Sequence, residues 1–445
     1  CRLVAKLAKR LKCVAEIVET ARTTGLDLDT VQWQAASVRT EHLLLKAGRT
    51  LGYAMPLKNC RPATVFGKPW AEDTTPFLHH PMPYGELQPH QQRLVDAGLQ
   101  GNTAPGGSVG LYHEPVAVLD FASLYPSIFI AHNICYSTLC LDKKPLLRGS
   151  DDDDDDGETQ KTTTTATTSP GAGKPPQRHR SPQSQATTFS HEFVATEERD
   201  GLVPRVLRAL VRARKVAKQG VKDARERGDD AAADVYDARQ LSLKMCANAT
   251  YGYTGSNVSS LEGKPLAESC LRWGNFYCRE AVRLIEEQQQ QHRTFEFGEK
   301  KQEARRRVIY AQTDSVFVSL PGRSYAEAVA EGRALATAVS DALPDPIRLE
   351  HQRVMQPFLL VQVNRYAGAE QTMTDDGAPK ASKTEMMMTE TKPAMLHVKG
   401  VGADRGSAAF VRRVLRACLD AALARRDVDL AFERARTAVD ALLSG

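Results

Sequence analysis

The chain has 445 residues, of which 42% are hydrophobic, so it is long enough for two or three domains with cores of their own. Its formal net charge of +5 is only a weak indication of a polyanionic partner. The nine cysteines include no Cys-x-x-Cys pair, which argues against a zinc ribbon or a disulfide framework and favours a reducing, intracellular compartment. No run of 18 apolar residues and no secretory leader occurs, so we expect a soluble protein with no membrane partner. The chain starts at Cys1, inside a predicted helix, which indicates a fragment of a longer protein.

Apolar side chains recur at three- and four-residue spacing over residues 2–24 and 31–55, which predicts two helices separated by a break after Thr24. Residues 56–110 are rich in proline, glycine and histidine and form an irregular lead-in. Its histidines have neither the spacing nor the partner set of a metal site, so no metal is expected there.

The next apolar run, residues 115–119, predicts a buried strand that delivers Asp120 into a tight turn, with a helix following over 128–136. Far along the chain, residues 308–318 place apolar β-formers on both sides of a polar turn, which predicts a hairpin with Asp314 at its tip. Two carboxylates that a fold brings together can hold two Mg²⁺ ions roughly 3.5–4 Å apart and catalyse a phosphoryl displacement. The alternative is a strand and a turn that each carry an incidental acid.

Residues 149–190 differ in composition from everything around them. Six consecutive aspartates, Asp151 to Asp156, lead into a threonine-rich and then a Pro/Ser/Gln-rich tract. Such a tract cannot bury enough apolar surface to fold, so we predict a disordered insertion. The aspartates fit a solvated acidic block better than a Mg²⁺ site, and the block could discourage contacts with nucleic acid or recruit a basic partner.

Beyond the insertion the pattern becomes helical and basic. Ten Lys or Arg and three Asp or Glu lie between Arg199 and Arg227, which concentrates positive potential on one predicted helix. A return helix is expected over 237–251, and an apolar helix over 267–291. Taken alone, a basic helix is often only a solvated face.

The chain after the predicted hairpin mixes helices and strands. We expect a helix over 324–343, strands over 346–350 and 358–368, and helices from 407 to 443.

Three stretches resemble motifs of the family B DNA polymerases. Residues 120–127, Asp-Phe-Ala-Ser-Leu-Tyr-Pro-Ser, resemble motif A, and residues 310–315, Tyr-Ala-Gln-Thr-Asp-Ser, resemble a variant of motif C. Lys244, Asn248 and Tyr251 follow one another at spacings of four and three residues and so lie along one face of the return helix. This polar and aromatic stripe resembles motif B. The resemblance covers most of residues 15–148 and 191–425. It implies an α+β fold of the right-hand polymerase type, with an antiparallel palm sheet, helical fingers and a partial helical thumb.

The resemblance also implies a division of the chain into six parts. These are the end of an exonuclease-like domain with connecting helices (1–55), a first part of the palm with motif A (56–148), the insertion (149–190), the fingers helices with motif B (191–256), a second part of the palm with motif C (257–398) and the start of a thumb (399–445). No acidic exonuclease signature occurs, so the chain alone is not expected to proofread.

The resemblance implies roles for individual residues. Asp120 and Asp314 would be the catalytic residues and would bind two Mg²⁺ ions. The nucleotide would be bound by residues of motif A and the fingers: Ser123, Leu124, Tyr125, Arg214, Lys218, Lys244, Asn248 and Tyr251. Tyr125 would lie under the incoming sugar and exclude a 2′-hydroxyl, a case of specificity by steric rejection. Primer-template DNA would contact Gly252, Arg365, Tyr366 and Lys399.

Several positions depart from the family pattern. Ala311 replaces the glycine of motif C, Asp200 replaces a lysine at the entry to the fingers, and residues 399–405 match the entry to the thumb only in part. Three further departures bear on activity and on DNA binding. Gln312 replaces the first aspartate of motif C and cannot supply an anionic metal ligand, so we expect reduced activity and expect Gln312→Asp to raise the rate or relax the Mg²⁺ requirement. Val363 and Asn364 replace two lysines that grip the primer end, and the loss of two phosphate contacts predicts weaker, less salt-dependent DNA binding.

Within the family, residues 110–115, 252–257 and 265–269 most resemble the zeta type, whereas residues 131–133 resemble the delta type. The zeta type implies translesion synthesis in the nucleus with accessory subunits, and the delta type implies replication. A different class of function stays open, a degenerate polymerase that serves as a DNA-binding scaffold. The retained set of Asp120, Asp314, Tyr125, Lys244 and Asn248 argues against decay.

Overall fold

The computed structural model describes residues 2–10, 12–53, 78–79, 92, 108–140, 191–256, 259–291, 305–371, 395–401 and 406–444. The predicted insertion at 149–190 and most of the irregular lead-in lie outside the described residues. Within the described ranges, none of the helices combines the length and the apolar character needed to cross a bilayer.

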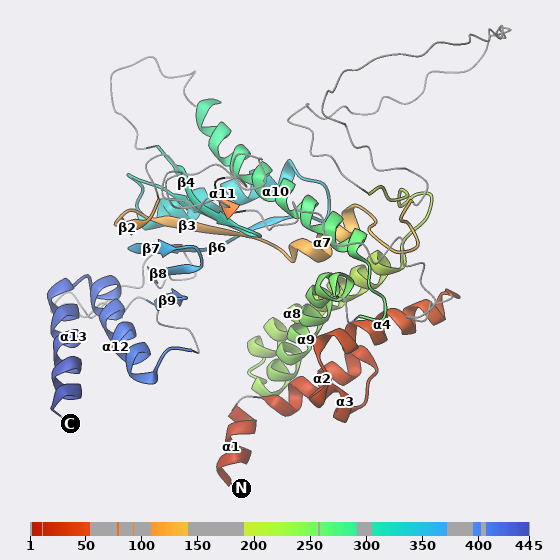
Figure 1. The fold of residues 1–445 in the computed structure, drawn as a ribbon, viewed down its shortest axis with the longest axis horizontal. Coiled ribbons are helices and arrows are strands. Elements are labelled where there is room, and N and C mark those ends of the chain that lie inside the picture. Colours follow the sequence, from red (N-terminus) through yellow and green to blue (C-terminus); the bar gives the residue numbers. More distant parts are fainter. Residues whose placement is uncertain are drawn as a thin grey trace, which may run out of the picture.

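The centre of the described chain consists of two antiparallel sheets (Figure 1). The first sheet has the strand order β1 (Leu78–His79), β4 (Arg307–Gln312), β5 (Ser315–Ser319), β3 (Val116–Phe121) and β6 (Leu349–Met355). The second sheet has the order β2 (Gly110–Tyr112), β7 (Phe358–Gln362), β8 (Arg365–Glu370) and β9 (Met395–Lys399). The mixed α+β class predicted from the sequence is confirmed.

Both faces of β3 are buried, which explains its continuous apolar run. Ala117 and Leu119 belong to the core cluster formed with α10 (Lys264–Gln291) and α11 (Tyr325–Asp341). Val116 and Val118 belong to a second cluster, which joins the first sheet to the second. Because side chains alternate along a strand, Asp120 lies in phase with this second pair and faces the side of the second sheet.

Apart from α10 and α11, which pack on the first sheet, the helices form two separate groups. The first group comprises α1 (Arg2–Arg10), α2 (Cys13–Thr24), α3 (Leu28–Trp33), α4 (Ala36–Thr50), α7 (Leu124–Ala131), α8 (Leu202–Glu226) and α9 (Asp230–Gly255). The second comprises α12 (Ala409–Leu419), the short π-helical segment η4 (Asp420–Ala424) and α13 (Val428–Leu443). Figure 1 shows the paired α8 and α9 beside α2 and α4, and α12 with α13 as a distinct projection near β9.

Five predicted elements differ from those observed. The helix expected over 2–24 is two helices, α1 and α2, because Lys12 before α2 has a left-handed backbone with a φ of 55°. The strand expected over 346–350 is β6, which begins at Leu349 and continues to Met355. The helix expected over 31–55 is two helices, because Gln34 at the end of α3 adopts an extended backbone with ψ of 152°. The helix behind Asp120 begins at Leu124 and ends at Ala131, earlier than expected. The strand expected over 358–368 is a hairpin of β7 and β8, which turns at Asn364 with a φ of 59°.

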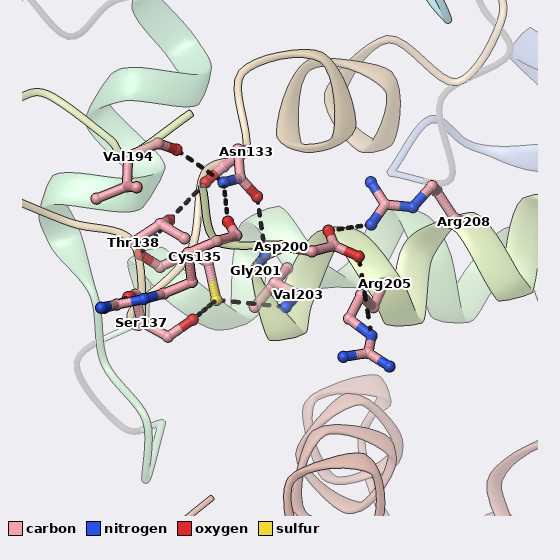
Figure 2. Close-up of polar contacts among 11 residues, drawn as sticks. Asn133, Cys135, Ser137, Thr138, Val194, Asp200, Gly201, Val203, Arg205 and Arg208 are labelled. Carbon is pink, nitrogen blue, oxygen red and sulfur yellow. Dashed lines mark hydrogen bonds and ion pairs between the residues drawn. The ribbon is translucent and has the colours of Figure 1, made fainter. Parts of the chain in front are cut away.

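Asn133 joins the two ends of the chain that flank the predicted insertion (Figure 2). Its side-chain nitrogen donates to the carbonyl oxygens of Val194 at 2.8 Å and Arg199 at 2.7 Å, and its side-chain oxygen accepts from the Gly201 amide at 2.9 Å. The amide of Cys140 also donates to the carbonyl of Glu192. The long basic helix α8 therefore starts at a fixed position relative to β3 and α7, whatever lies between residues 140 and 191.

Candidate active site

Asp120 and Asp314 are neighbours in the folded chain, although they are far apart in sequence. The β4–β5 hairpin turns over Thr313 and Asp314, and β5 pairs with β3 so that Asp120 lies opposite Ser315. The Phe121 amide donates to the carbonyl oxygen of Asp314 at 2.8 Å. The sheet register thus brings together the two carboxylates that the sequence predicted as a pair.

Two side chains hold the Asp120 carboxylate. The Ser315 hydroxyl donates to one oxygen at 2.7 Å, and the Gln352 side-chain amide donates to the other at 2.6 Å. Gln352 is the extra residue of a β-bulge in β6, where the pairing with β3 shifts between Val118 and Leu119. A bulge re-aims a side chain, which is how Gln352 reaches the carboxylate.

The two carboxylates lie in an environment that disfavours their charge. Burial raises the pKa of Asp120 to about 6, and the charges of Asp314 and Glu350 act in the same direction, against the Ser315 hydrogen bond and the charge of Lys244. Burial also raises the pKa of Asp314, while Lys399 and Lys244 favour its charged form. Lys244 and Lys399 thus act on the two carboxylates through their charges, but these charges do not offset the effect of burial. A bound cation would relieve this repulsion.

Left-handed backbone flanks both carboxylates. Ser123, three residues after Asp120, has a φ of 52°, and Thr313, directly before Asp314, has a φ of 56°. A β-branched residue rarely adopts this conformation, and such strain is characteristic of functional sites. The strain at these positions lets each strand end abruptly and leaves its acid at the turn.

Helices α7, α8 and α9 contribute the remaining side chains of the site. The Arg214 guanidinium on α8 donates to the Ser123 hydroxyl at 3.1 Å, and burial lowers the pKa of Arg214. The rings of Tyr125 on α7 and Tyr251 on α9 lie with their centroids 4.4 Å apart. Burial raises the pKa of both tyrosines, which keeps them neutral. The α8–α9 pair is thereby tied to the turn that follows Asp120.

Comparison with known protein families decides where this arrangement belongs. The model of DNA polymerase family B matches residues 27–444. The chain belongs to DNA polymerase family B.

Individual relatives support the family assignment. The chain is 28% identical to the DNA polymerase delta catalytic subunit of Drosophila melanogaster, over 98% of this chain and 33% of the relative. It is 32% identical to the delta catalytic subunit of Mesocricetus auratus, over 82% of this chain and 26% of the relative. It is 32% identical to the DNA polymerase zeta catalytic subunit of Drosophila melanogaster, over 64% of this chain and 12% of the relative. The chain therefore spans a third or less of the length of these curated relatives.

The residues predicted from the family B motifs fall into two sets. Those that the structure connects are Asp120, Asp314, Ser123, Tyr125, Arg214, Tyr251, Lys244 and Lys399, the two lysines through their charges. Leu124 is buried at the start of α7. Lys218, Asn248, Gly252 and Arg365 are exposed, and no described contact links them to the carboxylates. Tyr366 also belongs to the connected set, because the charges of Asp120 and Asp314 add to burial in raising the pKa of its hydroxyl. Its ring lies under the Lys399 ammonium, 5.6 Å from the ring centroid.

Family B polymerases use divalent metal ions in catalysis, and the two carboxylates fit such ions. Mg²⁺ is usually held by one or two carboxylates, with the remaining positions filled by water and substrate phosphates. Asp120 and Asp314 supply two, and no group of three or more His, Cys, Asp or Glu side chains suited to a metal occurs among the described residues. A metal here would therefore depend on the substrate for part of its coordination.

Sequence reasoning missed the groups that orient Asp120. Ser315 could have been found, because it is the residue that faces Asp120 once the motif C hairpin is paired with β3. Gln352 could not have been found, because it reaches the carboxylate only through a bulge that no turn residue marks in the sequence. Glu350, opposite Asp120 on β6, follows from the same pairing.

Proposed function

We propose that the chain is the catalytic part of a template-directed DNA polymerase, which adds deoxynucleotides to the 3′ end of a primer. The observation that carries this proposal is the juxtaposition of Asp120, on strand β3, and Asp314, in the turn before strand β5, with the pKa of both carboxylates raised by burial although the charges of Lys244 and Lys399 act on the site. Two Mg²⁺ ions held there would activate the attacking 3′-oxygen and stabilise the leaving pyrophosphate.

The remaining groups of the site position the substrates. Ser315 and Gln352 orient the Asp120 carboxylate through their hydrogen bonds. Arg214, Lys218 and Lys244 would neutralise the triphosphate, since phosphoryl transfer depends on positioning and charge stabilisation. Asn248 and Tyr251 would line the floor beside the sugar and base.

The sugar and the DNA would meet different parts of the site. Tyr125, fixed against Tyr251, would exclude a 2′-hydroxyl. Leu124 would pack beneath the nucleotide, and Gly252, Arg365, Tyr366 and Lys399 would contact the primer-template duplex.

The right-hand arrangement and its boundaries belong to the same proposal. The two sheets would form the palm (56–148 and 257–398), α8 and α9 the fingers (191–256), and α12 and α13 the start of the thumb (399–445). Residues 1–55 would be the end of an exonuclease-like domain with its connecting helices. Rotation of the α8–α9 pair toward the palm would close the site on a correct base pair.

We propose the zeta type, and hence synthesis past lesions and mismatches in the nucleus with accessory subunits, on the residues that surround motifs A and B. The delta type is a second candidate, because delta catalytic subunits match up to 98% of the chain. Extension from a mismatched primer end separates the two. Efficient mismatch extension supports the zeta type, and its absence beside efficient matched extension supports the delta type.

Template direction is the property to test first. A labelled primer-template is incubated with the protein, Mg²⁺ and each deoxynucleoside triphosphate in turn. We expect addition of the complementary nucleotide alone. If the protein binds the duplex and adds none of the four, it is a scaffold and the proposal fails.

A further inference from the structure

Three of the positions at which this chain departs from the family B pattern lie around one buried side chain, Tyr310. Gln312 and Asn364 are hydrogen-bonded to it, and Val363 packs against the cluster to which it belongs. This tyrosine lies on β4 and is 1% exposed. Its ring packs 5.2 Å from the ring of Phe317, in the cluster that joins the first sheet to the second. Val363, one of the three departures, packs against the same cluster.

The Tyr310 hydroxyl connects the other two departures. It donates its proton to the side-chain oxygen of Gln312 and accepts the backbone N–H of Asn364 at 3.2 Å. A phenol has one proton and can accept as well as donate, so both contacts are made with fixed polarity. Burial raises the pKa of Tyr310 to about 12, and the hydroxyl therefore stays protonated and able to donate.

Asn364 in turn links this contact to the strand that precedes α12. It turns the β7–β8 hairpin with a left-handed backbone, and its carbonyl oxygen lies against Gly400, where a Cβ would collide with it. Gly400 itself has a φ of 67° and directly follows β9. A continuous set of contacts thus runs from the catalytic turn, through Tyr310, to the tip of the hairpin and the end of β9.

We propose that Gln312 is a positioning residue that acts through Tyr310 to hold the β7–β8 hairpin, with Arg365 and Tyr366, in register with Asp120 and Asp314. We call the contacts of Gln312, Tyr310 and Asn364 the brace. Its consequence for DNA rests on the proposed polymerase function: the brace would set where the primer end lies relative to the two carboxylates. The amide oxygen accepts a hydrogen bond without adding a third negative charge to a pair that already disfavours charge. Gln312 and Asn364 then belong to one set of contacts, and neither substitution indicates a degenerate polymerase.

Hydrogen exchange of the Asn364 amide tests the brace without any reference to catalysis. Tyr310→Phe removes its acceptor, and Gln312→Ala removes the group that fixes the hydroxyl. We expect each to speed exchange at Asn364 roughly three- to tenfold, the range for one hydrogen bond.

Tyr325→Phe is a matched control for these variants. The Tyr325 hydroxyl also donates to a carbonyl, that of Val354 at 3.0 Å, and accepts a backbone N–H, that of Gln371 at 3.2 Å. Unchanged exchange at Asn364 in Gln312→Ala would overturn the proposal.

Binding and turnover then test the consequence for the primer. We expect Gln312→Ala and Tyr310→Phe to raise the Kd for primer-template roughly three- to tenfold, with the KM of the incoming nucleotide changed less than about twofold. A general loss of folded protein would lower the amount of active enzyme and leave Kd unchanged.

Two further variants sharpen the test. The double variant should be no weaker than Tyr310→Phe alone, because both changes break one connection. Gln312→Glu, which keeps the length and the acceptor, should restore the slow exchange at Asn364. Multiplied effects in the double variant, or no restoration by Gln312→Glu, would contradict the brace. If the unmodified protein never extends a primer, the polymerase proposal fails while the exchange measurements still decide on the brace.

Discussion

At the scale of single residues, the protonation state of Asp120 controls whether a cation can bind. Burial raises its pKa from the ordinary 3.8 to about 6, and metal ligation requires the carboxylate form. We therefore predict that the apparent affinity for Mg²⁺ falls by about tenfold per pH unit below pH 6 and levels off above it. A pH series of Mg²⁺ titrations of activity measures this dependence. A flat profile between pH 5 and 7 would contradict the raised pKa.

The same residue predicts a stability effect of defined sign. Because the folded-state pKa is raised, the contribution of Asp120 to stability is present below its unfolded value and is lost as pH rises through about 6. Asp120→Asn should therefore stabilise the metal-free protein at pH 7.5, by about 1–2 kcal/mol, and much less at pH 4. Thermal unfolding of both proteins at the two pH values gives the comparison, and equal shifts at both would count against it.

We predict that Tyr125 selects deoxyribonucleotides over ribonucleotides. Its ring is held by Tyr251, and Gly274 on α10 leaves room for it, since a Cβ there would approach within 3.3 Å. Tyr125→Ala should lower the preference for deoxyribonucleotides over ribonucleotides by at least about tenfold, because the steric rejection is removed. The ratio of kcat/KM values for the two nucleotides measures this preference. Undiminished discrimination would remove Tyr125 from the sugar site.

At the scale of elements, the sequence located most helices and strands, because long periodic runs dominate their own structure. The failures share a physical cause. Asn364 adopts a left-handed backbone because the Tyr310 hydroxyl and Gly400 surround it, and neither neighbour is close in sequence. Gln352 leaves the regular pairing because β6 bulges against β3. Contacts made only in the folded chain cannot be read from local patterns.

Asn133 is predicted to hold the start of helix α8 in place. It is 2% exposed and makes three backbone contacts that fix the start of α8. Asn133→Asp keeps the acceptor for Gly201 and loses both donors, so it should destabilise the fold by about 1–3 kcal/mol and speed amide exchange in the first turn of α8. Gln219→Ala, on the exposed face of the same helix, is the control and should change neither. Normal exchange in Asn133→Asp would mean that α8 is held by other contacts.

At the scale of the whole molecule, DNA binding should depend on salt through a small number of phosphate contacts. Arg365 and Lys399 are exposed on neighbouring strands of the second sheet. Arg365→Gln and Lys399→Gln should each lower the slope of log Kd against log salt by about one, whatever the DNA sequence. Lys6→Gln on α1 is the matched control and should leave the slope unchanged. Unaltered slopes in the first two variants would place the duplex elsewhere.

Single-turnover primer extension with Mg²⁺ by the unmodified chain, Asp120→Asn and Asp314→Asn shows whether the two carboxylates form one catalytic site. Removing either carboxylate should lower the rate by about 10³-fold or more, since metal-based stabilisation contributes several kcal/mol to the barrier. Asp341→Asn, an exposed acid at the end of α11, should retain the full rate. Loss of extension in both site variants would establish that strands β3 and β5 build one nucleotidyl-transfer site. Extension that survives either change would mean that the two carboxylates do not form one catalytic site.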